Sequence, residues 1–284
     1  MRKGLAILYI GSAISTIAST CMGIFYSSGG MARTVQNIYG QAVTLFGDGV
    51  YANDSIMKAG ATKGTDIAVL FAAFMLICTI TFLRNKPFVS FLQCGLLSIM
   101  LYASTSVIMG ITFNRLFLLY LVQFGCTFFA FVISMTDLLR KKSFEQKVYD
   151  KRWTGTAIFL IFGGCSVLQW LSYILPVVIS GRPMEIIDIY TTEPTFTIDL
   201  AIILPTTIYC GVMLLKKKRI AYQLAPVLLI LLTGVAVCVI AQTIMQSYLG
   251  LVLNISQLLG LVVLFVILGI IALFSNIKLL RHTK

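Results

Sequence analysis

The sequence predicts an all-α membrane protein, a polytopic helical bundle of eight transmembrane helices with both termini in the cytoplasm. Three observations predict it. The chain of 284 residues is 58% hydrophobic and only 11% charged, whereas charged residues approach about a quarter of a soluble domain. Its apolar runs have the length of about 20 residues that a spanning helix needs. Its basic residues gather in segments that would share one side of a membrane.

Eight apolar runs are candidate spans. They are continuous and do not alternate between polar and apolar residues, which favours helices over a transmembrane barrel. In chain order they cover residues 4–28, 67–83, 88–113, 116–135, 153–180, 198–215, 220–246 and 255–274. The first run follows Arg2 and Lys3 and could be a secretory signal, but its length favours an uncleaved first helix.

The charge pattern predicts the orientation. Seventeen of the 22 Lys and Arg residues lie on one side of the eight spans, and seven of the ten Asp and Glu residues lie on the other. By the positive-inside rule the basic side is cytoplasmic, which predicts a plasma-membrane protein with both termini inside. The net charge of +12 is then a topology signal. We expect the lipid bilayer as a partner and no nucleic acid, because the sequence has no soluble basic face with interleaved aromatic residues.

We expect a single membrane domain, residues 1–284, built from two related halves. Residues 1–139 and 153–284 are joined by a cytoplasmic linker, residues 140–152. Each half carries an Asp at its second apolar run (Asp66, Asp199) and an Asn near its fourth (Asn114, Asn254). Because each half has an even number of spans, such a duplication would be a parallel 4+4 repeat. The alternative is that apolar helices resemble one another by composition alone.

Polar side chains within the apolar runs are concentrated toward the outer side. Such groups are costly in lipid and usually face a bundle interior or a wet cavity, so we expect an outward-facing polar cavity. The candidate ligand-binding residues are Asp66, Tyr102, Asn114, Gln123, Tyr190, Thr191, Thr192, Asp199, Gln242 and Gln246. Two alternatives stay open: amides and hydroxyls can hold helices together, and Asp66 and Asp199 can cap helix N-termini. Pro205 is expected to bend the sixth run.

Residues 29–65 are the longest hydrophilic stretch and the predicted extracellular loop. Glycines in this loop permit tight turns, and we expect it to fold as a lid. Its aromatic residues Tyr39, Phe46 and Tyr51 are expected to rest at the membrane interface. The second outer loop, which starts near Arg182, would lie on the same face.

No catalytic residue, metal or cofactor is expected. The one histidine, His282, lies in the C-terminal tail, which removes Ser-His pairs and His-ligated zinc. Glycine-rich phosphate loops and metalloprotease motifs are absent from the sequence. The seven cysteines are isolated within apolar runs without a CxxC pair, so we expect them to be free.

Four segments together resemble a family of uncharacterised bacterial integral membrane proteins with about eight spans. They are GQAVTLFGDGVYANDS from Gly40, KGTDIAVL from Lys63, FNRLFLLY from Phe113 and YTTEPTFTIDLAIILP from Tyr190. The resemblance covers nearly the whole chain. It implies the fold, a membrane location and a bacterial origin, but no activity.

Three functions remain open on the sequence alone. The first is a ligand-binding or transporter-like protein whose ligand is an unknown small molecule, ion or lipid, because its two carboxylates could bind a proton or a cation. The second is a membrane sensor or accessory subunit with a protein partner. The third is an intramembrane acid-base enzyme, which would need the carboxyl groups of Asp66 and Asp199 to converge.

Overall fold

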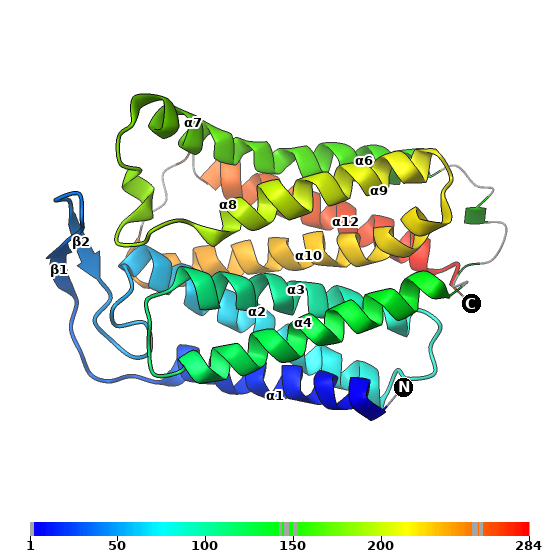
Figure 1. Cartoon of the computed structure of the whole chain (residues 1–284), viewed down its shortest axis with the longest axis horizontal. Coiled ribbons are helices and arrows are strands. Elements are labelled where there is room, and N and C mark those ends of the chain that lie inside the picture. The colour runs from blue at the N-terminus through cyan, green and yellow to red at the C-terminus, as the bar shows by residue number, and fades with distance from the viewer. Residues whose placement is uncertain are drawn as a thin grey trace.

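A computed structural model describes residues 3–141, 144, 148–149, 153–251, 255 and 258–283. Within these residues the chain is a bundle of helices with one small β-hairpin (Figure 1). The α-helices are α1 Lys3–Phe25, α2 Ile56–Thr81, α3 Val89–Gly110, α4 Phe117–Arg140, α6 Thr154–Cys165, α7 Leu171–Ser180, α8 Pro194–Ile198, α9 Leu204–Leu215, α10 Arg219–Tyr248 and α12 Leu264–Leu280. Short 3-10 segments η1 Ser166–Trp170 and η2 Glu185–Ile187, π-helical segments η3 Asp199–Ile203 and η4 Leu258–Val263, and strands β1 Arg33–Gln36 and β2 Ala42–Leu45 complete it.

Eight continuous helical segments of the described residues are long and apolar enough to cross a membrane, as the sequence predicts. They are Gly4–Phe25, Ile56–Thr81, Val89–Gly110, Phe117–Arg140, Thr154–Ser180, Pro194–Leu215, Arg219–Tyr248 and Leu258–Leu280. The fifth joins α6, η1 and α7, and the sixth joins α8, η3 and α9. The all-α bundle is therefore confirmed, with the hairpin as an addition that the sequence analysis did not foresee.

The second helix begins much earlier than predicted, because Ile56 and the nine residues after it are helical and do not belong to the loop. Ser55 is the N-cap and its side chain accepts a hydrogen bond from Lys58 N. Gly60 and Gly64 make this stretch a poor helix by propensity, but they let α2 pack closely on α10. A Cβ at Gly64 would overlap the backbone of Gln242, so the glycines allow the tight contact of a small-xxx-small seam.

Helix α10 lies in the middle of the bundle and packs on α2, α3, α9 and α12 (Figure 1). Its seam with α3 is reciprocal, because Ile230 of α10 lies over Gly95, and Ile99 of α3 lies over Gly234. In each case a Cβ on the glycine would overlap the isoleucine side chain. The hairpin lies at one end of the bundle, and the start of α1 and the end of α12 lie at the other (Figure 1).

Residues 26–55, here called the outer cap, fold back over the end of the bundle between α1 and α2. Strands β1 and β2 pair antiparallel, with Arg33 opposite Leu45, and Leu45 also bridges to Ser55. The turn after β2 is held by Asp48, whose Oδ1 accepts from the backbone N–H groups of Ser28 at 2.7 Å, Gly29 at 3.0 Å and Gly49 at 2.8 Å. The outer cap is thus an ordered structure tied to the end of α1.

Candidate functional site

Two acidic side chains are buried within membrane-length helices: Asp66 is 5% exposed and Asp199 is 6% exposed. Neither is the N-cap of a helix. The N-caps of α2 and α8 are Ser55 and Glu193, whose side chains accept from backbone N–H groups of the first turn. The capping alternative is therefore wrong for both aspartates, because the helices begin earlier than the apolar runs do.

Asp66 lies three turns into α2, directly under the outer cap. Tyr51 of the cap, 1% exposed, donates from Oη to Asp66 Oδ2 at 2.6 Å. Both side chains rest against Gly23 of α1, where a Cβ would overlap the carboxylate. Lys63, one turn before Asp66, donates from Nζ to Gly23 O at 2.8 Å and to Ile24 O at 3.3 Å. A cation at these last carbonyls of α1 is favoured by the helix dipole.

A small polar cavity adjoins Asp66 between α1, α2, α3 and α4. It is lined by Ser19, Thr20, Thr65, Asp66, Val69, Ala103, Val107, Tyr120 and Gln123, with a volume of about 10 Å³ available to the centre of a water-sized sphere. That is room for about one water molecule. Tyr120 Oη is buried and makes no hydrogen bond of normal geometry within the described chain. The cavity therefore offers a polar group that has unused hydrogen-bonding capacity.

Asp199 is held differently. Its Oδ1 accepts from Tyr102 Oη of α3 at 3.1 Å, and its Oδ2 accepts from Trp170 Nε1 of η1 at 2.8 Å. It opens the π-helical segment η3, in which Leu204 N donates back to Asp199 O. Where the sequence predicts a bend at Pro205, the structure has a π-helical turn just before the proline, which suits a residue that has no N–H to donate.

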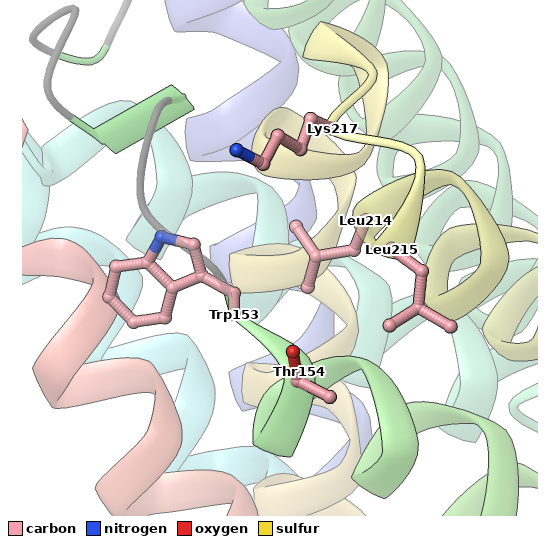
Figure 2. A pocket seen from close by; sticks show the side chains of 5 residues that line it. All are labelled: Trp153, Thr154, Leu214, Leu215 and Lys217. Carbon is pink, nitrogen blue, oxygen red and sulfur yellow. The ribbon is translucent and has the colours of Figure 1, made fainter.

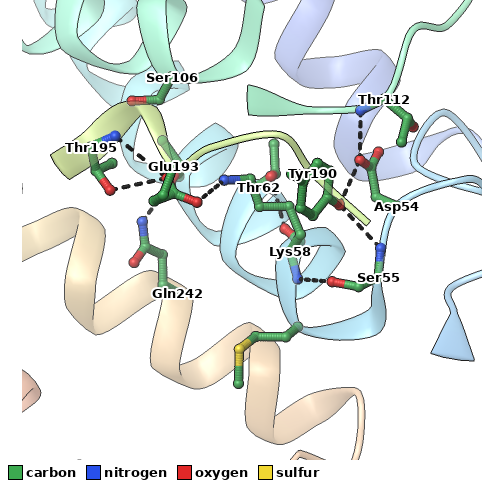
Figure 3. Close-up of polar contacts among 12 residues, drawn as sticks. Asp54, Ser55, Lys58, Thr62, Ser106, Thr112, Tyr190, Glu193, Thr195 and Gln242 are labelled. Carbon is green, nitrogen blue, oxygen red and sulfur yellow. Dashed lines mark hydrogen bonds and ion pairs between the residues drawn. The ribbon is translucent and has the colours of Figure 1, made fainter. Parts of the chain in front are cut away.

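A third polar cluster joins the outer cap to the second outer loop (Figure 3). Lys58 Nζ forms an ion pair with Glu193 Oε2 at 2.7 Å and lies 5.4 Å from the centre of the Tyr190 ring. Asp54 Oδ1 accepts from Thr112 N at 2.8 Å and from Tyr190 Oη at 2.9 Å. Burial raises the pKa of Asp54, although its hydrogen bonds with Thr112 and Tyr190 act in the opposite direction. This cluster thus ties the loop before α8 to the start of α2 and to the end of α3.

The ten predicted ligand-binding residues do not line one cavity. Asp66 and Gln123 share the small cavity, Tyr102 is bonded to Asp199, and Tyr190 belongs to the outer cluster. The remaining five have other surroundings. Gln242 Nε2 donates to Thr65 Oγ1 at 2.7 Å, and Gln246 Nε2 donates to Met57 O at 3.3 Å. Asn114 Oδ1 accepts from Leu116 N at 2.9 Å, and Thr191 and Thr192 are exposed in the loop. The amides thus mainly join helices, as the alternative interpretation held.

Asp66 and Asp199 do not share partners. Tyr102 of α3 bonds to Asp199, whereas Ala103 and Val107 of the same helix line the cavity beside Asp66. The two carboxylates thus have separate surroundings, which gives no support to an enzyme that uses both.

Sequence reasoning missed Tyr51, Ser19 and Thr20 as members of the site. Tyr51 was expected at the membrane interface, and that expectation is wrong because its side chain is buried against Asp66. A signal for the α1 residues does exist. The hydroxyl side chains of α1 recur at intervals of three and four residues, at Ser12, Ser15, Thr16, Ser19 and Thr20, which places them on one helix face.

A larger cavity of about 300 Å³ lies at the opposite end of the bundle. Trp153, Thr154, Leu214, Leu215 and Lys217 line it, from the start of α6 and the end of α9 (Figure 2). None of the predicted ligand-binding residues contributes to it. All seven cysteines are free, and the described residues hold no group of three His, Cys, Asp or Glu side chains that could bind a metal.

Comparison of the chain with models of known protein families, with curated proteins and with solved structures gives no match.

Proposed function

We propose that the chain is a multi-pass protein of the bacterial plasma membrane that binds a small ligand beneath the outer cap and acts as a transporter-like protein. The observation that carries this proposal is the carboxylate of Asp66. It is 5% exposed, accepts one hydrogen bond among the described residues, and adjoins a small cavity with a mainly polar lining. A buried carboxylate in a membrane-spanning segment is costly and usually marks an ion or substrate pathway.

Membrane insertion is supported by the outer surfaces of the helices as well as by their length. Large apolar side chains are exposed all round the bundle, among them Ile7 on α1, Phe71 on α2 and Phe162 on α6, each at least 64% exposed. Water would solvate such a surface poorly, whereas lipid tails match it. We propose that these side chains contact the bilayer.

The proposed orientation, with both termini cytoplasmic, is supported by the arrangement of the loops. The basic connections Arg84–Lys86 and Lys216–Arg219 lie at the end of the bundle where α1 begins and α12 ends. The outer cap lies at the other end, with acidic residues such as Asp48 and Asp54 (Figure 1). The positive-inside rule then places the outer cap outside the cell.

The proposed parallel repeat is supported by the order in which helices pack. Helix α2 contacts α1 and α3, and α3 contacts α4; in the second half, α9 contacts α6 and α10, and α10 contacts α12. Helices α3 and α10, which would correspond, also contact each other. Asn254 and most of the linker at residues 140–152 lie outside the described residues.

Access to Asp66 from the outer side would require the cap to move. The cap is held over the carboxylate by Tyr51, and the neighbouring outer cluster is held by the Lys58–Glu193 ion pair. We therefore interpret the arrangement as an occluded state, which is one step of an alternating-access cycle.

A thermal-shift screen of the purified protein in detergent tests the proposal. Ions, lipids and small metabolites are compared on the wild type and on Asp66→Asn at several pH values. A ligand at about 100 times its dissociation constant stabilises the native state by about 2.7 kcal/mol when it binds only that state. We expect at least one such ligand for the wild type and loss of its effect in Asp66→Asn.

Asp199→Asn is the matched control, because it removes the other buried carboxylate and leaves the cavity lining intact. If no ligand stabilises the wild type, or if every effect persists in Asp66→Asn, the transporter-like function is contradicted. The alternative of a sensor or accessory subunit would then be the better proposal.

A further inference from the structure

We infer that the cavity beside Asp66 is a binding site for one monovalent metal cation of about the size of Na⁺. This inference rests on the proposed function and specifies its ligand. The argument uses the chemistry of the cavity lining, its size and its charge.

The threonine hydroxyl groups of the lining present oxygen lone pairs and have no free hydrogen. Thr20 Oγ1 donates to Thr16 O at 2.8 Å, and Thr65 Oγ1 donates to Ala61 O at 3.0 Å. Because a hydroxyl has one hydrogen and two lone pairs, these bonds use up both hydrogens. Thr65 Oγ1 also accepts from Gln242 Nε2, so it keeps one lone pair, whereas Thr20 Oγ1 keeps two. An anion would need donors, so the hydroxyl groups of α1 and α2 favour a positively charged ligand.

Two further residues of the lining also supply acceptors, although Tyr120 and Gln123 keep donor hydrogens as well. Ser19 Oγ uses its hydrogen on Gln123 Oε1 at 2.7 Å or on Thr16 O at 3.0 Å. Asp66 contributes an oxygen, Oδ1, that accepts no hydrogen bond from the described residues, while Tyr51 is bonded to Oδ2. Carboxylate, hydroxyl and amide oxygens are the ligands that hard cations prefer.

The size and charge of the site restrict the cation. A volume of about 10 Å³ for the centre of a water-sized sphere admits one water-sized particle and excludes an organic substrate. One carboxylate balances a single positive charge. Lys63 is the nearest cation, but its ammonium group binds the carbonyls of Gly23 and Ile24 and lies 5.5 Å from the centre of the Phe46 ring. Because Lys63 keeps its positive charge close to the same carboxylate, a divalent ion would leave a larger excess of positive charge than a monovalent ion.

Cation binding would couple directly to the outer cap. Tyr51 bonds to the same carboxylate that would bind the cation, and its ring is 6.0 Å from Lys63 Nζ. A cation on Oδ1 keeps Asp66 ionised, which strengthens the hydrogen bond that Tyr51 donates. Occupancy of the site would thus favour the closed position of the cap.

The test is a sodium titration of the purified protein in choline chloride buffer, with thermal unfolding and equilibrium binding of radiolabelled sodium as readouts. Lithium and potassium are compared, and choline keeps the ionic strength constant. We expect saturable binding by the wild type, with a rise in Tm that exceeds the choline control. Asp66→Asn should lose both, and Asp199→Asn should keep both.

Thr20→Val is the second variant, because it removes one oxygen ligand, keeps the side-chain shape and leaves the carboxylate in place. It should weaken sodium binding by about tenfold, the cost of one charge-assisted contact. Choline-buffer Tm values show whether each variant folds.

Absence of saturable sodium binding by the wild type, or equal binding by Asp66→Asn, would overturn the inference. A stabilisation that follows pH alone and does not compete with sodium would assign the site to a proton, which also overturns it. If sodium fails but another ligand of the screen depends on Asp66, the proposed function stands and only the cation assignment fails.

Discussion

The two buried carboxylates differ in how far the protein satisfies them. Asp199 accepts one hydrogen bond on each oxygen, from Tyr102 and Trp170. Asp66 accepts one, from Tyr51, and adjoins a cavity with further oxygen atoms. A buried charge whose partners are all present can serve as a structural anchor, whereas one with unused capacity can bind a ligand. Burial alone therefore does not distinguish a ligand-binding carboxylate from a structural one, whereas the number of hydrogen-bond donors that contact it does.

The local backbone geometry favours the opposite assignment, in which Asp199 is the functional carboxylate. Asp199 opens a π-helical segment, a feature that is frequent at functional sites, whereas Asp66 lies in a regular part of α2. The π-helical turn is explained by Pro205, which follows it closely and has no backbone N–H. Removing the donors of Asp199 and crowding the side chain of Asp66 distinguishes the two interpretations.

The largest effect is expected when both donors of Asp199 are removed. Tyr102→Phe combined with Trp170→Phe leaves a buried carboxylate without a partner, which should destabilise the protein by about 3–5 kcal/mol. Chemical unfolding in detergent measures the loss.

The same two substitutions in an Asp199→Leu background give the cost of packing alone, because no charge is left to satisfy. We expect that cost to be much smaller. A loss below about 1 kcal/mol for the double substitution in the wild-type background would contradict the structural role of Asp199.

An intermediate effect is expected for Gly23→Ala at the Asp66 centre. The new methyl group would overlap Asp66 Oδ2 and Tyr51 Oη, so the cap must shift, at a cost of about 1–3 kcal/mol. Limited proteolysis should also cut the cap faster. Gly125→Ala on α4 is the control, because a Cβ there meets no atom within 4 Å. Gly125→Ala should be neutral or stabilise the protein by up to about 1 kcal/mol. An equal loss of stability in both variants would show that the side chains of Asp66 and Tyr51 can move aside at no cost.

The helical bundle could be predicted from the sequence because its apolar runs have the length and composition of helices that can cross a membrane. The start of α2 could not, because Gly60 and Gly64 disfavour a helix until they meet α10. The same error placed Asp66 at a helix end, when it lies three turns inside α2. Tertiary packing, which no local pattern records, decided that boundary.

The lining of the candidate site was predicted in part. Asp66 and Gln123 do line the cavity, since a carboxylate and an amide within apolar runs are unusual enough to be noticed. Tyr51 was missed because it lies in a loop, and only the fold of the cap brings it to Asp66. The separation of Asp66 from Asp199 depends on how α3 is rotated, which the sequence does not determine.

The smallest effect concerns pH and should be confined to the outer cap. Burial raises the folded-state pKa of Asp54 above its ordinary value of 3.8. The native state therefore binds this proton more tightly than the unfolded state does. The resulting stability is complete below the unfolded pKa and is lost as pH rises through the folded pKa. Compared with wild type, Asp54→Asn should lose less stability over that range, and hydrogen exchange should locate the wild-type loss in the cap.

Asp48 of the same cap should respond with the opposite sign. Slight burial acts to raise its pKa, but the hydrogen bonds from Ser27, Ser28 and Gly49 outweigh this and hold it at about 2. Its stabilising effect is therefore present above the unfolded value and lost as pH falls toward about 2. The difference in stability between wild type and Asp48→Asn should shrink in acid, whereas that between wild type and Asp54→Asn should grow at higher pH. Parallel pH profiles of stability for the two variants would contradict the opposite signs expected for Asp48 and Asp54. Changes in hydrogen exchange around Asp199 would show that the pH response is not confined to the cap.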